Sequence, residues 1–149
     1  MAVDETSSLV YASVNTEIWQ YNITNNHLVK VPEGDDATSG VAVTKSGHLI
    51  FAKGSSLVVK FENAVTVHML SEELIGPISC SSVYDDILLL SYASSFSLFD
   101  LYDGEVRKHQ TKFTPWKVQH YKVDEAEYLL VGEDSAVHLY QVTDGSLNL

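Results

Sequence analysis

The sequence has 149 residues, of which 45% are hydrophobic and 19% are charged. This length suits about one domain, and the composition excludes an intrinsically disordered chain. The 9 basic and 20 acidic residues give a net charge of −11, which argues against a surface that follows a phosphate backbone or an anionic membrane. We therefore do not expect nucleic acid to be a partner.

Nothing in the sequence favours secretion or a membrane span. Cys80 is the only cysteine, so no disulfide can form within the chain. The first residues lack the positive and apolar regions of a signal peptide, and the longest aliphatic run, Ile87–Leu90, is too short to cross a bilayer. The sequence predicts a cytoplasmic protein without direct membrane insertion.

Short apolar runs separated by turn residues follow one another along the chain, as expected for β-hairpins. Residues 1–8 are predicted to be a flexible lead, and Leu9–Tyr21 a hairpin that is followed by an outer strand at Leu28–Val31. The later predicted strands are 40–43, 49–52, 57–61 and 64–69, then 76–80, 87–92, 95–101 and 105–108, and finally 115–118, 128–132 and 136–142. A last turn is predicted at Asp144-Gly145.

The hairpins repeat with a period near 40 residues. Runs of three bulky apolar residues before a small one begin at Leu9, Leu49, Leu88 and Leu129, which lie 40, 39 and 41 positions apart. Short strands with this period are typical of propeller blades. We therefore predict an all-β fold, a WD40-like β-propeller with four strands per blade.

The predicted propeller has about three and a half blades. They cover about residues 9–31, 40–69, 76–108 and 115–149. The first blade is expected to lack an inner strand and the fourth most of an outer strand, so the chain is predicted to be the N-terminal half of a larger propeller or a truncated product of one. Because exposed blade flanks and strand edges associate readily, we expect this half to be a poorly behaved monomer on its own.

No catalytic, metal or cofactor site is predicted. The six histidines are scattered without metal-ligand spacing, and no phosphate-binding or nucleophile motif occurs. The acidic pairs are interpreted as solvated turns, with acid–base chemistry or calcium as the alternative; they are Asp35-Asp36, Glu72-Glu73, Asp85-Asp86 and Asp124-Glu125. The chain is not expected to be an enzyme, although catalytic residues outside it would leave that alternative open.

Four aromatic residues occupy similar places near the ends of the second hairpin strands: Trp19, Phe61, Phe99 and Tyr140. We interpret them as packing between neighbouring blades, with a partner-binding hot spot as the alternative. His138 is interpreted as a structural residue. Gly132 ends a strand, so we predict a close backbone approach or a positive φ there, and a loss of stability in Gly132→Val.

One segment, about a fifth of the chain, resembles the kaptin family. The similarity consists of a Phe-Thr-Pro-Trp segment and the hairpin Leu-Leu-Val-Gly-x-Asp-x-x-Val-His-Leu-Tyr that follows it. The matching motif residues, to which the resemblance gives a structural or interaction role, are Phe113, Thr114, Pro115, Trp116, Gly132, Asp134, His138, Leu139 and Tyr140.

The resemblance implies a non-catalytic protein-interaction scaffold. Its partners would be the other subunits of KICSTOR, a complex that restrains TORC1 signalling when amino acids are scarce, and it would be recruited from the cytoplasm to the lysosomal surface. The family is also associated with actin filaments, so a cytoskeletal protein that binds actin is an alternative. The acidity of the chain counts against direct binding, since filaments are acidic too. A generic WD40-like adaptor is the other alternative.

Overall fold

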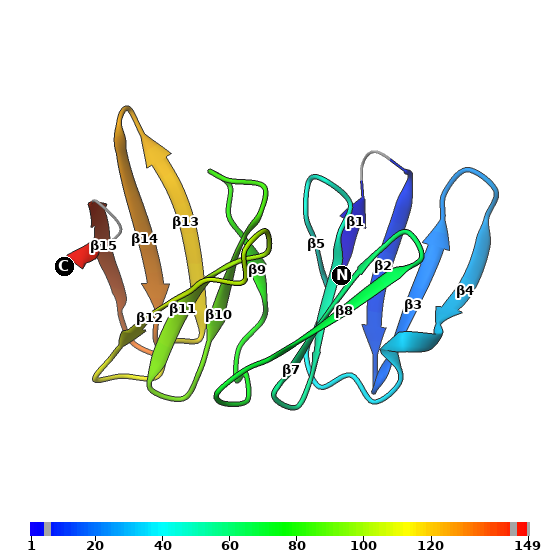
Figure 1. Ribbon diagram of the computed structural model, residues 1–149, viewed down its shortest axis with the longest axis horizontal. Coiled ribbons are helices and arrows are strands. Elements are labelled where there is room, and N and C mark those ends of the chain that lie inside the picture. The colour runs from blue at the N-terminus through cyan, green and yellow to red at the C-terminus, as the bar shows by residue number, and fades with distance from the viewer. Residues whose placement is uncertain (5–6, 144–145, 149) are drawn as a thin grey trace. The chain divides into compact units, whose positions relative to one another are not determined.

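The computed structural model describes residues 1–4, 7–143 and 146–148. The fold is all-β, as predicted. The only helix among the described residues is a single 3-10 turn, η1 (Pro32–Gly34). The strands of the described residues form four antiparallel sheets of four strands each, and the strands of every sheet are adjacent in chain order (Figure 1). Each sheet is therefore a meander built from consecutive hairpins.

The strand bounds follow the predicted hairpins closely in the second and third strands of each sheet, but the strands predicted at 40–43, 76–80 and 115–118 are found at 42–43, 79–80 and 117–123. The first sheet contains β1 (Ala2–Asp4), β2 (Leu9–Val14), β3 (Glu17–Asn22) and β4 (His27–Val31), and the second contains β5 (Ala42–Val43), β6 (Leu49–Lys53), β7 (Ser56–Phe61) and β8 (Ala64–Met69). The third contains β9 (Ser79–Cys80), β10 (Ile87–Ser91), β11 (Ser95–Asp100) and β12 (Val106–Gln110), and the fourth contains β13 (Lys117–Val123), β14 (Ala126–Gly132), β15 (Val137–Thr143) and β16 (Ser146–Asn148).

The chain divides into two compact units, Met1–Glu73 with the first two sheets and Leu74–Leu149 with the other two. The core of the first unit includes Ile18, Phe51 and Val58. The core of the second includes Leu89, Phe96, Leu129 and Tyr140. In both, the two middle strands of a sheet carry most of the buried side chains, so each unit is held together by apolar contacts between its own two sheets.

Several hairpin turns use a left-handed residue at the first loop position. Asn15 has φ 55°, Glu62 φ 55° and Asp124 φ 54°. Each is the first residue after a strand and lies two positions before the start of the next strand. Asparagine and aspartate tolerate this conformation because their short polar side chains can hydrogen-bond locally, which accounts for Asn15 and Asp124. The tight turns keep the paired strands in a register that places their apolar residues on common faces.

The predicted flexible lead over residues 1–8 is wrong for its first part. Ala2, Val3 and Asp4 pair antiparallel with Tyr11, Val10 and Leu9, and Asp4 is buried. A run of three residues that ends on an aspartate has no strand pattern of its own. It becomes a strand because β2 supplies an edge to pair with, so the first sheet has the inner strand that was expected to be missing.

The fourth sheet also has an outer strand that was expected to be largely missing. β16 pairs antiparallel with β15, with Gln141 opposite Asn148 and Val142 opposite Leu147. The predicted turn at Asp144-Gly145 lies outside the described residues. The described residues therefore form four four-stranded sheets instead of the three and a half that were expected.

Candidate interaction groove

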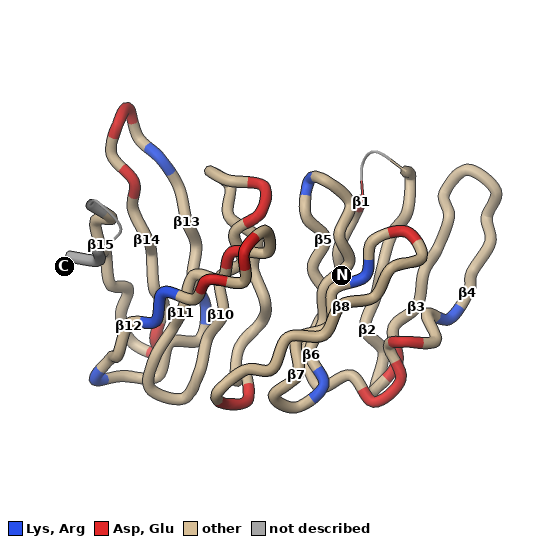
Figure 2. Tube along the Cα trace, in the orientation of Figure 1, with Lys and Arg blue, Asp and Glu red and all other residues tan. Residues whose placement is uncertain are grey.

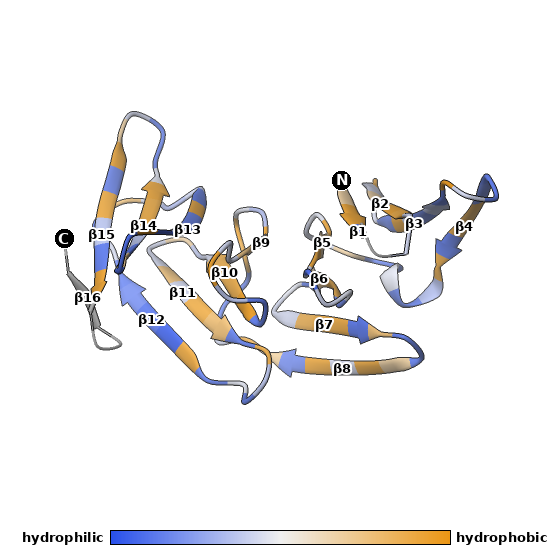
Figure 3. Cartoon of the chain, turned by 90° about the horizontal axis from the view of Figure 1, so that it is seen from above, coloured by the Kyte–Doolittle hydropathy of each residue, from blue (hydrophilic) through white to orange (hydrophobic). Residues whose placement is uncertain are grey.

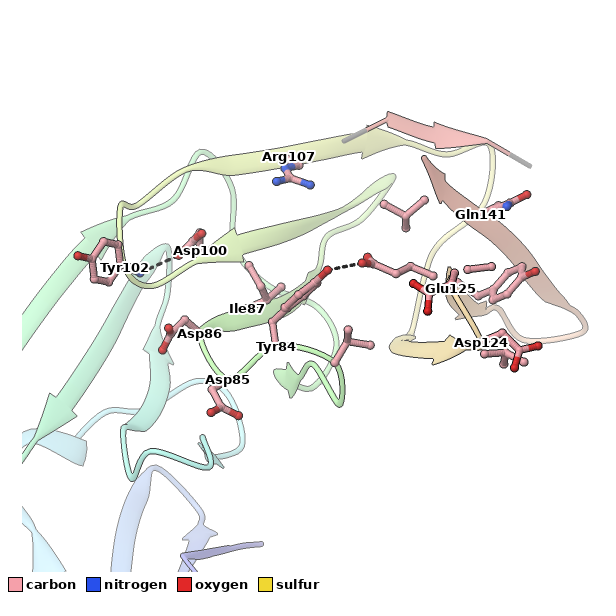
Figure 4. A pocket seen from close by; sticks show the side chains of 16 residues that line it. Tyr84, Asp85, Asp86, Ile87, Asp100, Tyr102, Arg107, Asp124, Glu125 and Gln141 are labelled. Atoms are coloured by element: carbon pink, nitrogen blue, oxygen red, sulfur yellow. Dashed lines mark hydrogen bonds between the residues drawn. The ribbon is translucent and has the colours of Figure 1, made fainter. Parts of the chain in front are cut away.

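The unit Leu74–Leu149 contains a groove of 1360 Å³ that is open to solvent (Figure 4). One wall comes from the third sheet, through the turn before β10 and the ends of β11 and β12. The other comes from the fourth sheet, through the β13–β14 turn and the C-terminal part of β15. The groove thus lies where the two sheets of this unit meet.

Acidic side chains dominate the lining. The six carboxylates are Asp85, Asp86, Asp100, Asp124, Glu125 and Glu127, and Arg107 is the only lysine or arginine among the described lining residues. Figure 2 shows this acidity at the turn between β13 and β14 and at the turn before β10. Carboxylates gathered around one hollow favour a positively charged occupant.

Three tyrosines give the groove aromatic surface as well. Tyr84 is 47% exposed and Tyr102 is 90% exposed, while the ring of Tyr128 stacks on Tyr121 at 5.8 Å between centroids. Exposed tyrosines combine a large apolar body with a polar tip and are common at protein interfaces. The groove therefore offers both charge and apolar contact to an occupant.

A hydrogen-bond chain runs from the buried side of the groove to its surface. The Ser81 hydroxyl lies 2.7 Å from His120 Nδ1, and His120 Nε2 lies 3.3 Å from Glu127 Oε2. The other oxygen of Glu127 accepts a hydrogen bond from the Tyr84 hydroxyl, which Figure 4 marks with a dashed line. Ser81 and Tyr84 belong to the turn before β10, whereas His120 and Glu127 belong to β13 and β14. These hydrogen bonds therefore connect the third sheet to the fourth.

The bonds around Ser81 define the proton positions in this chain. Its Oγ accepts the backbone N–H groups of Val83, at 3.0 Å, and Tyr84, at 3.1 Å, so its own proton is directed to His120 Nδ1. Neutral His120 then carries its proton on Nε2 and donates it to Glu127. Burial lowers the pKa of His120, against the raising effect of Glu127, and the bond to Glu127 raises the pKa of Tyr84.

Ser81, His120 and Glu127 have the residue types of a hydrolytic triad, but their arrangement does not suit nucleophilic catalysis. Ser81 is only 5% exposed, and both of its lone pairs are occupied by backbone donors. A nucleophilic serine needs an accessible oxygen next to its base. These hydrogen bonds therefore have a structural role and hold the groove wall in place.

The structure brings both halves of the family motif together in the fourth sheet. The Phe113 ring stacks on the His138 ring at 3.9 Å and 8°, and His138 Nε2 lies 3.0 Å from Glu133 Oε1. The backbone N–H of Trp116 donates to the carbonyl of Gly132 at 2.8 Å. Stacking and hydrogen bonding thus connect His138 to Phe113 and Glu133.

The remaining motif residues differ in exposure. Pro115 is buried and Thr114 half-buried, whereas Trp116, Asp134 and Leu139 are exposed. Tyr140 is buried with its ring edge toward Phe96, at 5.4 Å. None of the nine motif residues is among those that line the groove. The motif residues thus belong to the packing of the fourth sheet, while the groove is formed by other residues.

The close backbone approach or positive φ predicted at Gly132 is wrong. Its φ is not among the positive values, and a Cβ there would meet only the Lys117 carbonyl oxygen at 3.8 Å, an ordinary contact. The close approaches occur at Gly34 and Gly76. A Cβ at Gly76 would lie 2.3 Å from the Trp116 carbonyl oxygen, so this glycine is required where the chain enters the third sheet.

The aromatic residues of the second hairpin strands fall into two groups. Phe99 and Tyr140 are both 2% exposed and belong to the interior of their unit. Phe61 is 40% exposed and stacks on His48 within its own sheet, at 4.5 Å. Trp19 is half-buried and donates its indole N–H to Glu17. Packing between sheets therefore describes only part of this set.

The acidic pairs Asp85-Asp86 and Asp124-Glu125 lie in turns, as predicted, but their convergence on one groove was not predicted. The two pairs are 39 positions apart, which is the repeat length, so they occupy equivalent turns of successive sheets. That spacing is the signal that could have indicated a shared site.

Among the described residues no group of three or more His, Cys, Asp or Glu side chains is placed to hold a metal ion. Within the same residues no helix is long and apolar enough to cross a membrane.

Comparison with known proteins supports the fold alone. No family model and no curated protein matches the sequence. A chain in the solved complex of an S. cerevisiae Dbp5 variant bound to Nup159, a Gle1 variant, IP6 and ADP is similar in structure, with a TM-score of 0.66 at 9% sequence identity. The match covers 99% of this chain and 41% of that chain.

Proposed function

We propose that this chain is a non-catalytic protein-interaction module, with its sheets serving as blades of a β-propeller of the kaptin type. The repeat near 40 residues and the four-stranded meanders support the propeller. The proximity of Phe113, His138 and the Trp116–Gly132 backbone bond supports a common architecture for the kaptin-like segment. Propeller closure and family membership are themselves part of this proposal.

The observation that carries the proposal is the acidic, tyrosine-bearing groove of the unit Leu74–Leu149. Its 1360 Å³ and its open form suit a polypeptide segment. Its six carboxylates against one arginine select a segment rich in lysine or arginine. The tyrosines supply the apolar contacts that carry most of the binding free energy in such interfaces.

In the cell, the module would act as one subunit of the KICSTOR scaffold, in the cytoplasm and at the lysosomal surface. The groove would then hold a basic segment of another subunit. Affinity purification of the tagged chain, followed by mass spectrometry, tests this assignment. We expect other KICSTOR subunits to co-purify, and their absence would reject the kaptin assignment.

A pair of charge reversals tests the groove itself. Glu125 lies in the groove wall, whereas Glu62 lies in the β7–β8 turn, outside both the groove and the kaptin-like motif, and both residues are exposed. We expect Glu125→Lys to lose partners that Glu62→Lys retains. Equal recovery with both variants would show that partners bind elsewhere, even if the family assignment holds.

A further inference from the structure

The outer strand β8 (Ala64–Met69) is an exposed apolar strand edge in the unit Met1–Glu73. It is last in the strand order of its sheet, so β7 is its only strand partner among the described residues. All its residues except His68 are exposed. Val65, Val67 and Met69 are 42%, 54% and 73% exposed.

The backbone of β8 points alternately toward β7 and toward the free edge. The N–H of Leu70 donates to the Ser55 carbonyl at 2.7 Å, and this pair continues the β7–β8 register. Because donors and acceptors in an antiparallel pair alternate along the strand, Val65, Val67 and Met69 direct their N–H and C=O groups away from β7. Their side chains also share one face.

The absence of charged residues distinguishes β8 from the outer strands β4 and β12, while the three-residue outer strand β16 is uncharged too. β4 carries Lys30, and β12 carries Arg107 and Lys108, whereas β8 has no charged residue. Figure 3 shows β12 as mostly hydrophilic and β8 as hydrophobic over much of its length. Charged side chains are a usual means of preventing strand edges from pairing, and β8 lacks this protection.

We propose that β8 is a self-association edge, at which β8 of one copy pairs antiparallel with β8 of a second copy. The outward-pointing residues determine the register. With Val67 opposite Val67 of the second copy, Val65 lies opposite Met69 and all the outward residues form hydrogen-bonded pairs. The same register places these apolar side chains on one face, where they contact each other across the two-fold axis.

A second copy is the occupant that β8 accepts without placing like charges opposite each other, although the net charge of the chain as a whole opposes self-association. The chain carries a net charge of −11, so two copies can approach closely only where like charges are not placed opposite each other. Self-pairing of β4 or β12 would place lysine or arginine near its counterpart, whereas self-pairing of β8 brings together only uncharged side chains. The strand is therefore complementary to itself.

Sedimentation velocity over a concentration series of the chain tests the proposal. We expect a monomer–dimer equilibrium that Val67→Lys weakens by at least about tenfold, because it places two ammonium groups opposite each other. The matched control is Val29→Lys on β4, where the valine is 48% exposed, and it should leave the equilibrium unchanged. Circular dichroism confirms that both variants retain the β fold.

A crosslinking variant keeps the proposal testable by an independent route. In a Cys80→Ser background, Val67→Cys should form a disulfide between copies, because Cα atoms in hydrogen-bonded antiparallel pairs are about 5.5 Å apart, within disulfide range. Thr66→Cys, on the opposite face, should not. A wild-type chain that remains a monomer throughout the series, or a dimer unaffected by Val67→Lys, overturns the proposal.

Discussion

At the scale of single residues, the glycines show that a position in or near a strand does not by itself decide whether glycine is required there. Gly132 ends a strand and was expected to mark a close backbone approach or a positive φ, yet a Cβ there has room. Gly76 precedes a short strand in a stretch without strong pattern, yet its Cα faces the Trp116 carbonyl oxygen and the Ser91 side chain. The requirement for glycine comes from a neighbouring sheet, which the sequence around it does not show.

Gly76→Ala is therefore predicted to destabilise the unit Leu74–Leu149 by about 1–3 kcal/mol, as for other overpacked sites. The new Cβ would lie 2.3 Å from a backbone oxygen, which cannot move without shifting the strand entrance. Gly132→Ala is the matched control and should be neutral or slightly stabilising, since glycine costs conformational entropy in a strand. Urea unfolding of both variants gives the comparison, and an unchanged midpoint for Gly76→Ala would contradict the prediction.

His120 is predicted to make stability depend on pH. Burial lowers its pKa in the folded protein below the ordinary value of about 6.5. As the pH falls below about 6.5, the unfolded chain takes up a proton that the folded chain resists, so the free energy of unfolding decreases with falling pH. Above that range this histidine contributes no pH dependence.

The measurement is the unfolding free energy of wild type and His120→Asn at several pH values from neutral to mildly acidic. The difference between the two proteins cancels the titration of the other histidines. We expect wild type to lose more stability than the variant on acidification. Parallel curves would show that His120 titrates alike in both states.

At the scale of elements, the middle strands of each sheet are predicted to carry most of the stability. Leu89 on β10 is 1% exposed and packs in the core of its unit. Leu89→Ala should cost about 2–5 kcal/mol, because it removes buried methyl groups and leaves a cavity. Leu139→Ala removes the same atoms from a side chain that is 47% exposed and should cost much less. Thermal unfolding of the two variants distinguishes these outcomes, and equal losses would contradict the assigned burial.

The same distinction explains how much of the fold was predictable. Hairpins such as β6–β7 and β10–β11 were predicted because their apolar runs and turns are local in sequence. β1 and β16 have three residues each, and they form strands only because a sheet edge is present. Short edge strands depend on tertiary pairing, so their sequences carry little signal.

The groove was predictable only in its parts. Asp85 and Asp124 were correctly assigned to turns, because acidic residues between apolar runs favour turns. Their convergence depends on the packing of the third sheet against the fourth, and the Ser81–His120–Glu127 chain joins residues that are far apart in sequence. Neither feature has a local pattern, although the 39-residue spacing of the acidic pairs was a usable clue.

At the scale of the whole molecule, the net charge of −11 acts on both proposed associations. In the groove, the carboxylates attract a basic segment. At β8, two like-charged copies approach each other through an uncharged strand. Charge therefore assists the first association and opposes the second.

The two associations are predicted to respond to salt in opposite directions. Raising ionic strength shortens the screening length from about 8 Å at physiological salt to about 3 Å at 1 M. A fluorescent lysine-rich peptide should therefore bind the groove more weakly as salt increases, with Glu125→Lys binding weakly throughout. The dimer measured by sedimentation should become tighter over the same range, since long-range repulsion is screened while the β8 hydrogen bonds remain. Neutral salts that bind proteins weakly, such as sodium chloride, keep the comparison electrostatic.

If both equilibria weakened together, a shared loss of folded structure or a charged dimer interface would be indicated, and the uncharged β8 edge would be the wrong place for self-association.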